Sequence, residues 1–297
     1  MTPEQWAITG ANGYLGHALR ADLAASSIPS RGLARSGGAE IVGDIRDRHA
    51  VAGLVRGATV VVHLAAYVHQ GARGRRREAE CWSVNVDGTQ TLIDALQAGN
   101  PEAFAIFVSS ANVYRQQDEP LDEEAPLSGR TPYGRSKLEA ERRFQAAIAA
   151  GAIRGCILRP AVIFGPGAPG NMARLARMAR SGWAVEIAGG AQRKSIVPVS
   201  HAVAAIRAVA RCGDACNGEV FNVAGEALTI HEIIRALAGE RMPRIISLPR
   251  WLAAPAARLV PAVAAYMASS VLSGEKLARL PGFHPAETGA EALSRLR

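Results

Sequence analysis

The sequence lacks the features of a disulfide-stabilised or metal-binding protein. It holds only four cysteines in 297 residues, Cys81, Cys156, Cys212 and Cys216, which is too few for a disulfide framework in a chain of this length. Cys212 and Cys216 have no second ligand pair at the spacing of a zinc site, so no metal site is expected. We therefore expect free thiols and a reducing, cytoplasmic compartment.

The sequence also lacks a long uninterrupted apolar run. Residues 251–272 are apolar, but Pro255, Arg258 and Pro261 interrupt them, which favours short helices of a second domain over a membrane span. At the N-terminus no basic segment precedes an apolar stretch, so no secretory signal is expected.

Lysine is scarce. Only Lys137, Lys194 and Lys276 occur among 34 basic residues, and arginine supplies most of the charge behind the formal net value of +8. The arginines are scattered, and their one dense cluster, Arg73 with residues 75–77, is expected in a loop without interleaved aromatic residues. This pattern argues against a nucleic-acid partner and favours solubility or attraction of small anions.

What the chain does have, to about residue 160, is a regular alternation of apolar segments and helical patterns. The predicted strands are 5–9, 31–34, 40–43, 59–64, 104–109 and 155–159. The predicted helices are 14–25, 47–56, 84–98 and 134–150. Such alternation predicts an α/β fold with a Rossmann-type, doubly wound parallel sheet, whose ligands bind at the carboxyl ends of the strands.

The regular alternation ends after Pro160. We assign residues 1–165 to a dinucleotide-binding domain, to which 196–225 are expected to return. Residues 166–195 and 226–297 are assigned to a smaller, mostly helical substrate-binding domain.

A glycine-rich turn, Thr9–Gly16, directly follows the first predicted strand. Gly10 permits a tight turn, Gly13 removes a side chain where phosphates approach, and Gly16 allows close packing of helix and strand. The helix that follows would point its free N–H groups and positive dipole end at a pyrophosphate.

Tyr133 and Lys137 lie four residues apart at the start of a predicted helix, so both side chains share one face. An ammonium group beside a phenol stabilises the phenolate, and we predict a lowered pKa for Tyr133. Ser110, at the end of a predicted strand, would hold a substrate oxygen between itself and Tyr133. By themselves these residues also fit an exposed helix pair and, for Ser109 and Ser110, hydroxyls that satisfy backbone groups at a strand end.

The chain resembles the extended short-chain dehydrogenase/reductase family to about residue 225. The motifs that carry the resemblance, in order, are Thr9–Gly16, residues 43–47, His63–Ala66, Asn85–Thr89, Ser109–Ser110, Tyr133 with Lys137, Arg159–Pro160 and Phe164–Gly167. This family includes nucleotide-sugar epimerases, dehydratases and ketoreductases.

The resemblance implies an NAD(P)-dependent enzyme with Ser110, Tyr133 and Lys137 as catalytic residues, and Lys137 would also bind the nicotinamide ribose. The cofactor-binding residues that it implies are Gly10, Asn12, Gly13, Tyr14, Leu15, Gly16, Arg35, Asp44, Ile45, Leu64, Ala65, Ala66, Tyr133, Lys137 and Pro160. The implied substrate-binding residues are Asn171, Arg193 and Lys194, whereas Asn85 is implied to be structural.

The chain departs from the family pattern at the end of the second strand. Arg35 stands where NAD enzymes usually carry an acidic residue. An arginine there suits a 2′-phosphate, so NADP(H) is favoured over NAD(H), with Arg31 as a possible helper. A solvated loop charge is the alternative reading of Arg35.

Two further departures limit the reaction. Ser110-Ala111-Asn112 replaces the Thr-Asp-Glu of the family's dehydratases, and the missing carboxylates argue against a 4,6-dehydratase. His201 stands where Asp or Asn is common, and we interpret it as a packing or hydrogen-bonding residue.

The resemblance implies oxidation or reduction at C4 of a nucleotide-linked sugar, UDP being the expected nucleotide. A 4-ketoreductase for bacterial surface polysaccharide synthesis is favoured, and a UDP-sugar 4-epimerase is the alternative. A reductase or dehydrogenase of a non-sugar ketone or alcohol, and a non-catalytic dinucleotide-binding module, stay open as well. The family also implies a homodimer through the helices at 84–98 and 134–150.

Overall fold

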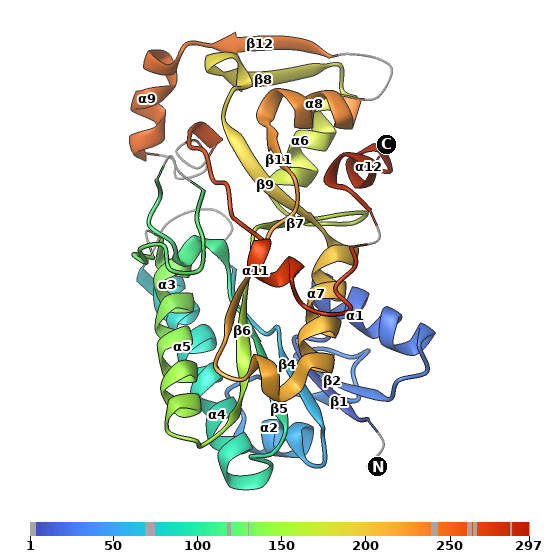
Figure 1. Cartoon of the computed structure of the whole chain (residues 1–297). Helices are drawn as coiled ribbons and strands as arrows, with labels where there is room; N and C mark the ends of the chain where they lie inside the picture. Colours follow the sequence, from blue (N-terminus) through green and yellow to red (C-terminus); the bar gives the residue numbers. More distant parts are fainter. Residues whose placement is uncertain are drawn as a thin grey trace.

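A seven-stranded parallel sheet forms the centre of the larger part of the molecule (Figure 1). The computed structural model describes residues 4–68, 75–117, 120–129, 131–238, 243–259, 263, 266–285 and 287–296. The strands of this sheet are β1 (Trp6–Thr9), β2 (Ser30–Ala34), β3 (Ile41–Val42), β4 (Val60–His63), β5 (Phe104–Val108), β6 (Arg154–Pro160) and β10 (Val220–Val223). Their order is β10-β6-β5-β4-β1-β2-β3, which confirms the Rossmann-type sheet.

Most of these strands are short apolar runs that are buried on both faces, as parallel strands under two helical layers must be, whereas the edge strand β3 leaves Val42 exposed. β1 and β4 are buried along their whole length. Ile8 of β1 pairs with Gly32 of β2 on one side and with Val62 of β4 on the other. The strand order therefore reverses beside β1, and a crevice opens there at the carboxyl ends.

Helices cover both faces of this sheet (Figure 1). One layer consists of α1 (Tyr14–Ala25) and α7 (Val199–Cys212), and the other of α2 (Arg48–Val55), α4 (Gly88–Gly99) and α5 (Pro132–Ala149). Leu19 and Ile206 pack with Ile8 in the first layer, and Leu92 and Phe144 pack in the second. The side chains of Asp47 and Thr131 cap the starts of α2 and α5.

The smaller part, expected to be mostly helical, also contains two small sheets. β7 (Val162–Phe164), β9 (Arg193–Pro198) and β11 (Ala227–Thr229) form one, and β8 (Trp183–Ile187) pairs in parallel with β12 (Arg244–Leu248) in the other. Its helices are α6 (Asn171–Arg180), α8 (Ile230–Ala238), α9 (Arg250–Leu259) and α12 (Gly289–Ser294), whereas α11 (Glu275–Ala278) packs against β10 of the large sheet.

The segment 196–225 returns to the large sheet later than expected. Its first residues, 196–198, end β9 and pair with β7 and β11 of the small sheet. Only α7 and β10 belong to the larger part. An apolar run such as Ile196–Pro198 fits either sheet, and its partners are distant in the sequence.

The arginine cluster lies on a helix and not in a loop. Arg75, Arg76 and Arg77 begin α3 (Arg75–Trp82), which continues through a π-helical turn, η1 (Ser83–Asp87), into α4. Too few apolar residues mark α3 for its period to be visible in the sequence. Arg73 lies outside the described residues.

Short 3₁₀ turns complete the fold, namely η2 (Ala111–Val113), η3 (Ala188–Gly190) and η4 (Gly213–Cys216). All four cysteines are free thiols. None of the described helices has the length and apolar character needed to cross a bilayer. The described residues also contain no cluster of three or more His, Cys, Asp or Glu side chains that could hold a metal.

Candidate active site at the carboxyl ends of the strands

The glycine-rich turn lies directly against the loop that follows β4. Gly10 has a φ of +69°, and a Cβ added there would lie 2.7 Å from the amide N of Ala65. A Cβ at Gly16 would overlap the carbonyl O of Gly10. Both positions therefore require glycine, because a side chain at Gly10 would force the turn away from Leu64 and Ala65, and one at Gly16 would force α1 away from the turn itself.

The start of α1 is left open for an anion. Its N-cap residue is Gly13, no side chain caps it, and its first turn holds no acidic residue. The first-turn N–H groups and the positive dipole end thus face the crevice beside β1. This arrangement fits the pyrophosphate of a dinucleotide.

Two residues of the turn connect it to its surroundings. The side-chain amide of Asn12 donates to the carbonyl groups of Ser36 (3.1 Å) and Gly37 (2.8 Å) and so fixes the loop after β2. The Tyr14 hydroxyl is buried, lacks a hydrogen-bond partner among the described residues and lies against Gly165. Burial raises the pKa of Tyr14 to about 12.

A buried hydrogen-bond chain starts at Thr9. Its Oγ1 accepts the amide N–H groups of Leu64 and Ala65, both at 3.1 Å, and lies 2.7 Å from Nδ1 of His63. Nε2 of His63 lies 3.0 Å from Oγ1 of Thr89, which donates to the carbonyl O of Asn85 (2.6 Å). Because the Thr9 hydroxyl already accepts two N–H groups, we infer that it donates its own proton to Nδ1 of His63. The ring proton of His63 is then on Nε2.

His63 is neutral, because burial, with a smaller effect of the Lys137 charge, lowers its pKa to about 3. Sequence reasoning noted His63 only as part of a motif and missed this role. The hydrogen-bond chain that starts at Thr9 continues through Asn85, whose Nδ2 donates to Oγ of Ser136 (2.9 Å). Ser136 in turn donates to the carbonyl O of Tyr133 (2.9 Å). The cofactor loop and the start of α5 are therefore held in one register.

The three residues predicted to be catalytic come together at the end of β5. Ser110 follows this strand and begins η2, and its hydroxyl lies close enough to the phenol of Tyr133 to lower the pKa of that phenol. Lys137, one turn further along α5, is only 2% exposed. Its Nζ donates to the carbonyl O of Val108 (2.7 Å) and lies 4.0 Å above the ring of Phe107.

The predicted lowering of the Tyr133 pKa is wrong for this structure. Burial raises the pKa to about 12 and outweighs the effect of the nearby Ser110 hydroxyl, which lowers it. Burial also lowers the pKa of Lys137 to about 7, against the opposing charge of Glu141. A site that disfavours both charged forms keeps the phenol protonated near pH 7.

Asn112 also belongs to the site, because it orients Ser110. The sequence analysis did not identify this role. Its backbone N–H (3.2 Å) and its side-chain amide (3.0 Å) both donate to Oγ of Ser110. The Ser110 proton is then directed away from Asn112, toward Tyr133 or a bound oxygen. The sequence feature that could have indicated this role is the side-chain amide of Asn112, which stands where the family's dehydratases carry a glutamate.

The residues predicted to bind the adenosine end lie around the ends of β2 and β3. Arg35 is exposed, and its charge contributes to the lowered pKa of Asp44, of which Arg46 is the main cause. The Asp44 carboxylate accepts from Nε (2.7 Å) and from a terminal nitrogen (2.9 Å) of Arg46. Ile45 is buried, with its side chain facing Gly88.

Arg31 does not help Arg35. Its guanidinium donates to the carbonyl groups of Leu54 (2.7 Å) and Arg56 at the end of α2, where a helix C-terminus attracts a cation. Leu64, Ala65 and Ala66 are partly buried at the end of β4, and Pro160 is buried at the end of β6.

The predicted substrate residues lie in the smaller part. Arg193 is exposed on β9 and donates to the carbonyl O of Ala227 (3.0 Å). Burial lowers the pKa of its neighbour Lys194 to about 8. Asn171 begins α6, but its side chain lies outside the described part of the chain. His201 is buried with its ring 5.1 Å from that of Phe283, which agrees with a packing role.

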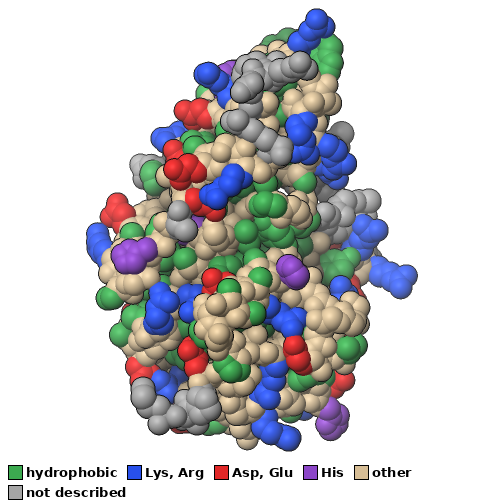
Figure 2. Space-filling model, turned by 90° about the vertical axis from the view of Figure 1, so that its right-hand side faces the viewer, with side chains coloured by type: hydrophobic (Ala, Val, Ile, Leu, Met, Phe, Trp, Pro, Cys, Tyr) green, Lys and Arg blue, Asp and Glu red, His purple; other side chains and the backbone are tan. Residues whose placement is uncertain are grey.

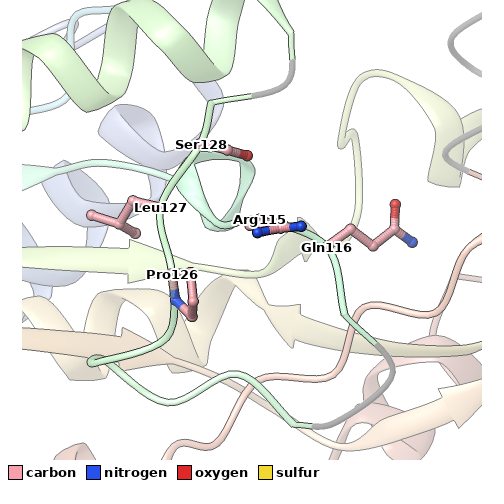
Figure 3. Close-up of a pocket in the computed structure, with 5 residues that line it drawn as sticks. All are labelled: Arg115, Gln116, Pro126, Leu127 and Ser128. Carbon is pink, nitrogen blue, oxygen red and sulfur yellow. The ribbon is translucent and has the colours of Figure 1, made fainter.

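Two hollows lie on this side of the fold. The first, of about 450 Å³, is formed by two adjoining segments, in which Gln116 and Leu127 point to opposite sides (Figure 3). Its lining residues are Arg115, Gln116, Pro126, Leu127 and Ser128. The second, of about 580 Å³, lies between the segment after η2 and α9 of the smaller part, and is lined by Gln116, Gln117, Ala188, Ala191, Gln192, Arg250, Ala257, Met267, Ala268 and Ser269.

Known proteins are similar to this chain in sequence and in fold. Residues 6–224 match the family model described as the NAD dependent epimerase/dehydratase family. The 2-alkyl-3-oxoalkanoate reductase of Stenotrophomonas maltophilia is 30% identical over 80% of this chain and 76% of the relative. The UDP-glucose 4-epimerase of Vibrio cholerae is 29% identical over 80% of this chain and 75% of the relative.

Among solved structures, MoeE5 in complex with UDP-glucuronic acid and NAD matches with a TM-score of 0.80 at 24% identity. The match covers 98% of this chain and 96% of MoeE5. It shows that the two proteins share the fold.

Proposed function

We propose that this chain, which belongs to the NAD-dependent epimerase/dehydratase family, is an NADP(H)-dependent 4-ketoreductase of a nucleotide-linked sugar. The observation that carries the proposal is the meeting of Ser110 and Tyr133 at the end of β5, with Lys137 one helical turn after Tyr133 on α5. Tyr133 keeps its proton at neutral pH, which suits an acid that completes a reduction.

Each residue of the site has a part in this reaction. Ser110, whose oxygen already accepts from Asn112, donates to the ketone oxygen and stabilises the negative charge that grows there. Tyr133 gives its proton to that oxygen, so the C4 ketone becomes an alcohol. Bound NADPH supplies the hydride that C4 receives. Lys137 would hold the nicotinamide ribose and help to return a proton to Tyr133.

Arg35 supports the choice of NADP(H). It is exposed directly after β2, and Asn12 fixes the loop that follows it. Arg35→Ala should weaken NADPH binding by roughly 10- to 100-fold, since a hydrogen bond to a charged group contributes about 1.5–3 kcal/mol. NADH binding, measured by the same fluorescence titration, should change little. An equal loss for both coenzymes would contradict this role.

The hollow beside α9 supports a nucleotide-sugar substrate. Gln116, Gln192, Arg250 and Ser269 give it hydrogen-bonding groups, and Oε1 of Gln192 is buried without a hydrogen-bond partner among the described residues. Such groups suit a base, a ribose or a diphosphate. We propose UDP as the nucleotide, in line with the UDP-glucuronic acid in the MoeE5 complex and the UDP-glucose for which the Vibrio cholerae epimerase is named.

The direct test follows the absorbance of NADPH while a UDP-4-keto sugar is supplied. The proposal expects stoichiometric loss of NADPH and formation of a UDP-sugar alcohol. A 4-epimerase, which the Vibrio cholerae relative favours, would interconvert two UDP-sugars with no net change in coenzyme. A reductase of a non-sugar ketone, which the Stenotrophomonas relative favours, would leave UDP-sugars unchanged and consume NADPH with a 3-oxoacid.

The assembly belongs to the same proposal. We expect a homodimer in the cytoplasm that pairs through α4 and α5, the two helices that the family resemblance implies for this contact. Light scattering of the full chain would give the mass of two copies, and a mass of one copy would contradict the pairing.

A further inference from the structure

Four large apolar side chains are exposed at the end of the smaller part where β8, β12 and α9 meet. Trp251 is 74% exposed, Leu252 52%, Trp183 50% and Ile246 45%. Arg244 and Arg250 lie between them in the sequence and are also exposed. We call these six residues the cap face.

The strand register places one part of the cap face on a single side of the two-stranded sheet. Trp183 pairs with Arg244 and Val185 with Ile246, and paired residues of parallel strands point to the same side. The guanidinium carbon of Arg244 lies 5.4 Å from the ring of Trp183. The alternate residues, Ala184 and Ile245, pack on the other side against the core of the smaller part.

Helix α9 lies on that same outer side and extends the cap face. Ala253 and Ala257 pack with Ile187 and Leu248, the last paired residues of the two strands. Trp251 and Leu252 precede this contact on α9 and point into solvent. The helix therefore packs at one end of the two-stranded sheet (Figure 1), and Trp183 and Ile246 stay exposed.

Helix α9 is apolar on its outward side as well as on the side that packs against the sheet, which is unusual for a helix at a protein surface. Besides Trp251 and Leu252, its outward residues include Pro255 and Ala256, both exposed. The chain has only four tryptophans, so leaving two of them at one end points to a second apolar surface that covers them.

The charge around the cap face indicates what this surface is. Residues 241–274 contain four arginines and no Asp or Glu. In Figure 2, which shows the side of the molecule away from α9, hydrophobic and basic side chains lie together at the upper end of the smaller part. A second copy of the same face would oppose arginine to arginine with no carboxylate to pair them. Tryptophan, leucine and arginine together suit the headgroup region of an anionic bilayer.

We propose that the cap face rests on the surface of an anionic lipid bilayer, without crossing it. Arg250 and Ala257 of α9 also line the 580 Å³ hollow, so this contact would bring the hollow next to the lipid surface. The proposal does not depend on which substrate the hollow takes.

Co-sedimentation of the full chain with vesicles tests the proposal. The protein should sediment with vesicles of equal parts phosphatidylcholine and phosphatidylglycerol, bind phosphatidylcholine alone much less, and be released by added salt. Removing two large apolar groups by Trp251→Ala with Leu252→Ala should weaken binding more than about tenfold. Arg244→Gln should weaken binding to anionic vesicles by about fivefold and leave binding to neutral vesicles unchanged.

Trp82→Ala is the matched control, because Trp82 is also 43% exposed but ends α3 in the larger part. This variant should bind vesicles like the original chain, and NADPH titration checks that every variant is folded. Failure of the original chain to bind anionic vesicles would overturn the proposal. So would an equal loss in Trp82→Ala, or a double variant that keeps vesicle binding while its mass by light scattering falls, which would assign the cap face to a second copy.

Discussion

At the scale of single residues, hydrogen-bond partners determine where the protons of the site lie, because each partner can act only as a donor or only as an acceptor toward its neighbour. Asn112 gives two N–H groups to Ser110, and the Thr9 hydroxyl accepts two and faces His63. Burial then keeps Tyr133 protonated and His63 neutral. The sequence could name Ser110, Tyr133 and Lys137 from motif and spacing. It could not give their pKa values, because these depend on a burial that only the folded chain has.

Asn112 is predicted to act through Ser110. Asn112→Ala should lower kcat by roughly tenfold, because the Ser110 hydroxyl loses a donor that orients it. The Kd for NADPH should stay unchanged, since Asn112 follows β5 and not the glycine-rich turn. Steady-state kinetics with coenzyme titration separate the two, and a parallel loss of coenzyme binding would indicate a structural role instead.

His63 should make the fold sensitive to acid. Its pKa is about 3 in the folded chain against an ordinary value of 6.5, so below pH 6.5 only the unfolded chain takes up this proton. Stability from this group is complete above pH 6.5 and falls by up to about 1.4 kcal/mol per pH unit as the pH drops toward 3.

Urea denaturation at several pH values checks this slope. His63→Gln has no group that titrates in this range, so its free energy of unfolding should fall less steeply between about pH 6 and pH 5. Identical slopes for the two proteins would show that His63 is not held neutral.

At the scale of elements, the turn into α1 depends on glycines whose missing Cβ atoms allow close backbone contacts. Arg31 shows a limit of sequence reasoning at this scale. Arg31 is the second residue of β2, so it lies at the start of the strand, whereas Arg35 follows its end, and the Arg31 side chain turns to the carbonyl groups at the end of α2. Residues at the two ends of one strand lie at opposite edges of the sheet, so Arg31 cannot share a ligand site with Arg35.

Two helical glycines give a matched pair of substitutions. In Gly16→Ala the new Cβ would overlap the carbonyl O of Gly10, so we expect a loss of stability of about 1–3 kcal/mol and weaker NADPH binding. In Gly53→Ala, on α2, the Cβ meets nothing within 4 Å, and stability should rise by up to about 1 kcal/mol. Thermal denaturation of both variants is the measurement, and the same sign for both would contradict the close packing of the turn.

At the scale of the whole molecule, the large sheet could be predicted and the small sheets could not. Each strand of the large sheet up to β6 is a short apolar run separated from the next by a helical pattern or a short connection, which local sequence reveals. β7 and β11 have three residues each and join β9 from positions about 30 residues away on either side. Such pairing is decided by tertiary contacts and leaves almost no local signal.

The central claim is that the Tyr133 hydroxyl supplies the proton that completes reduction of a ketone. The measurement that tests it most directly is NADPH oxidation with a UDP-4-keto sugar by the original chain and by Tyr133→Phe. The account predicts a kcat at least about 100-fold lower for the variant, with an unchanged Kd for NADPH. Undiminished turnover by Tyr133→Phe would contradict it and leave the chain only a coenzyme-binding role at this position.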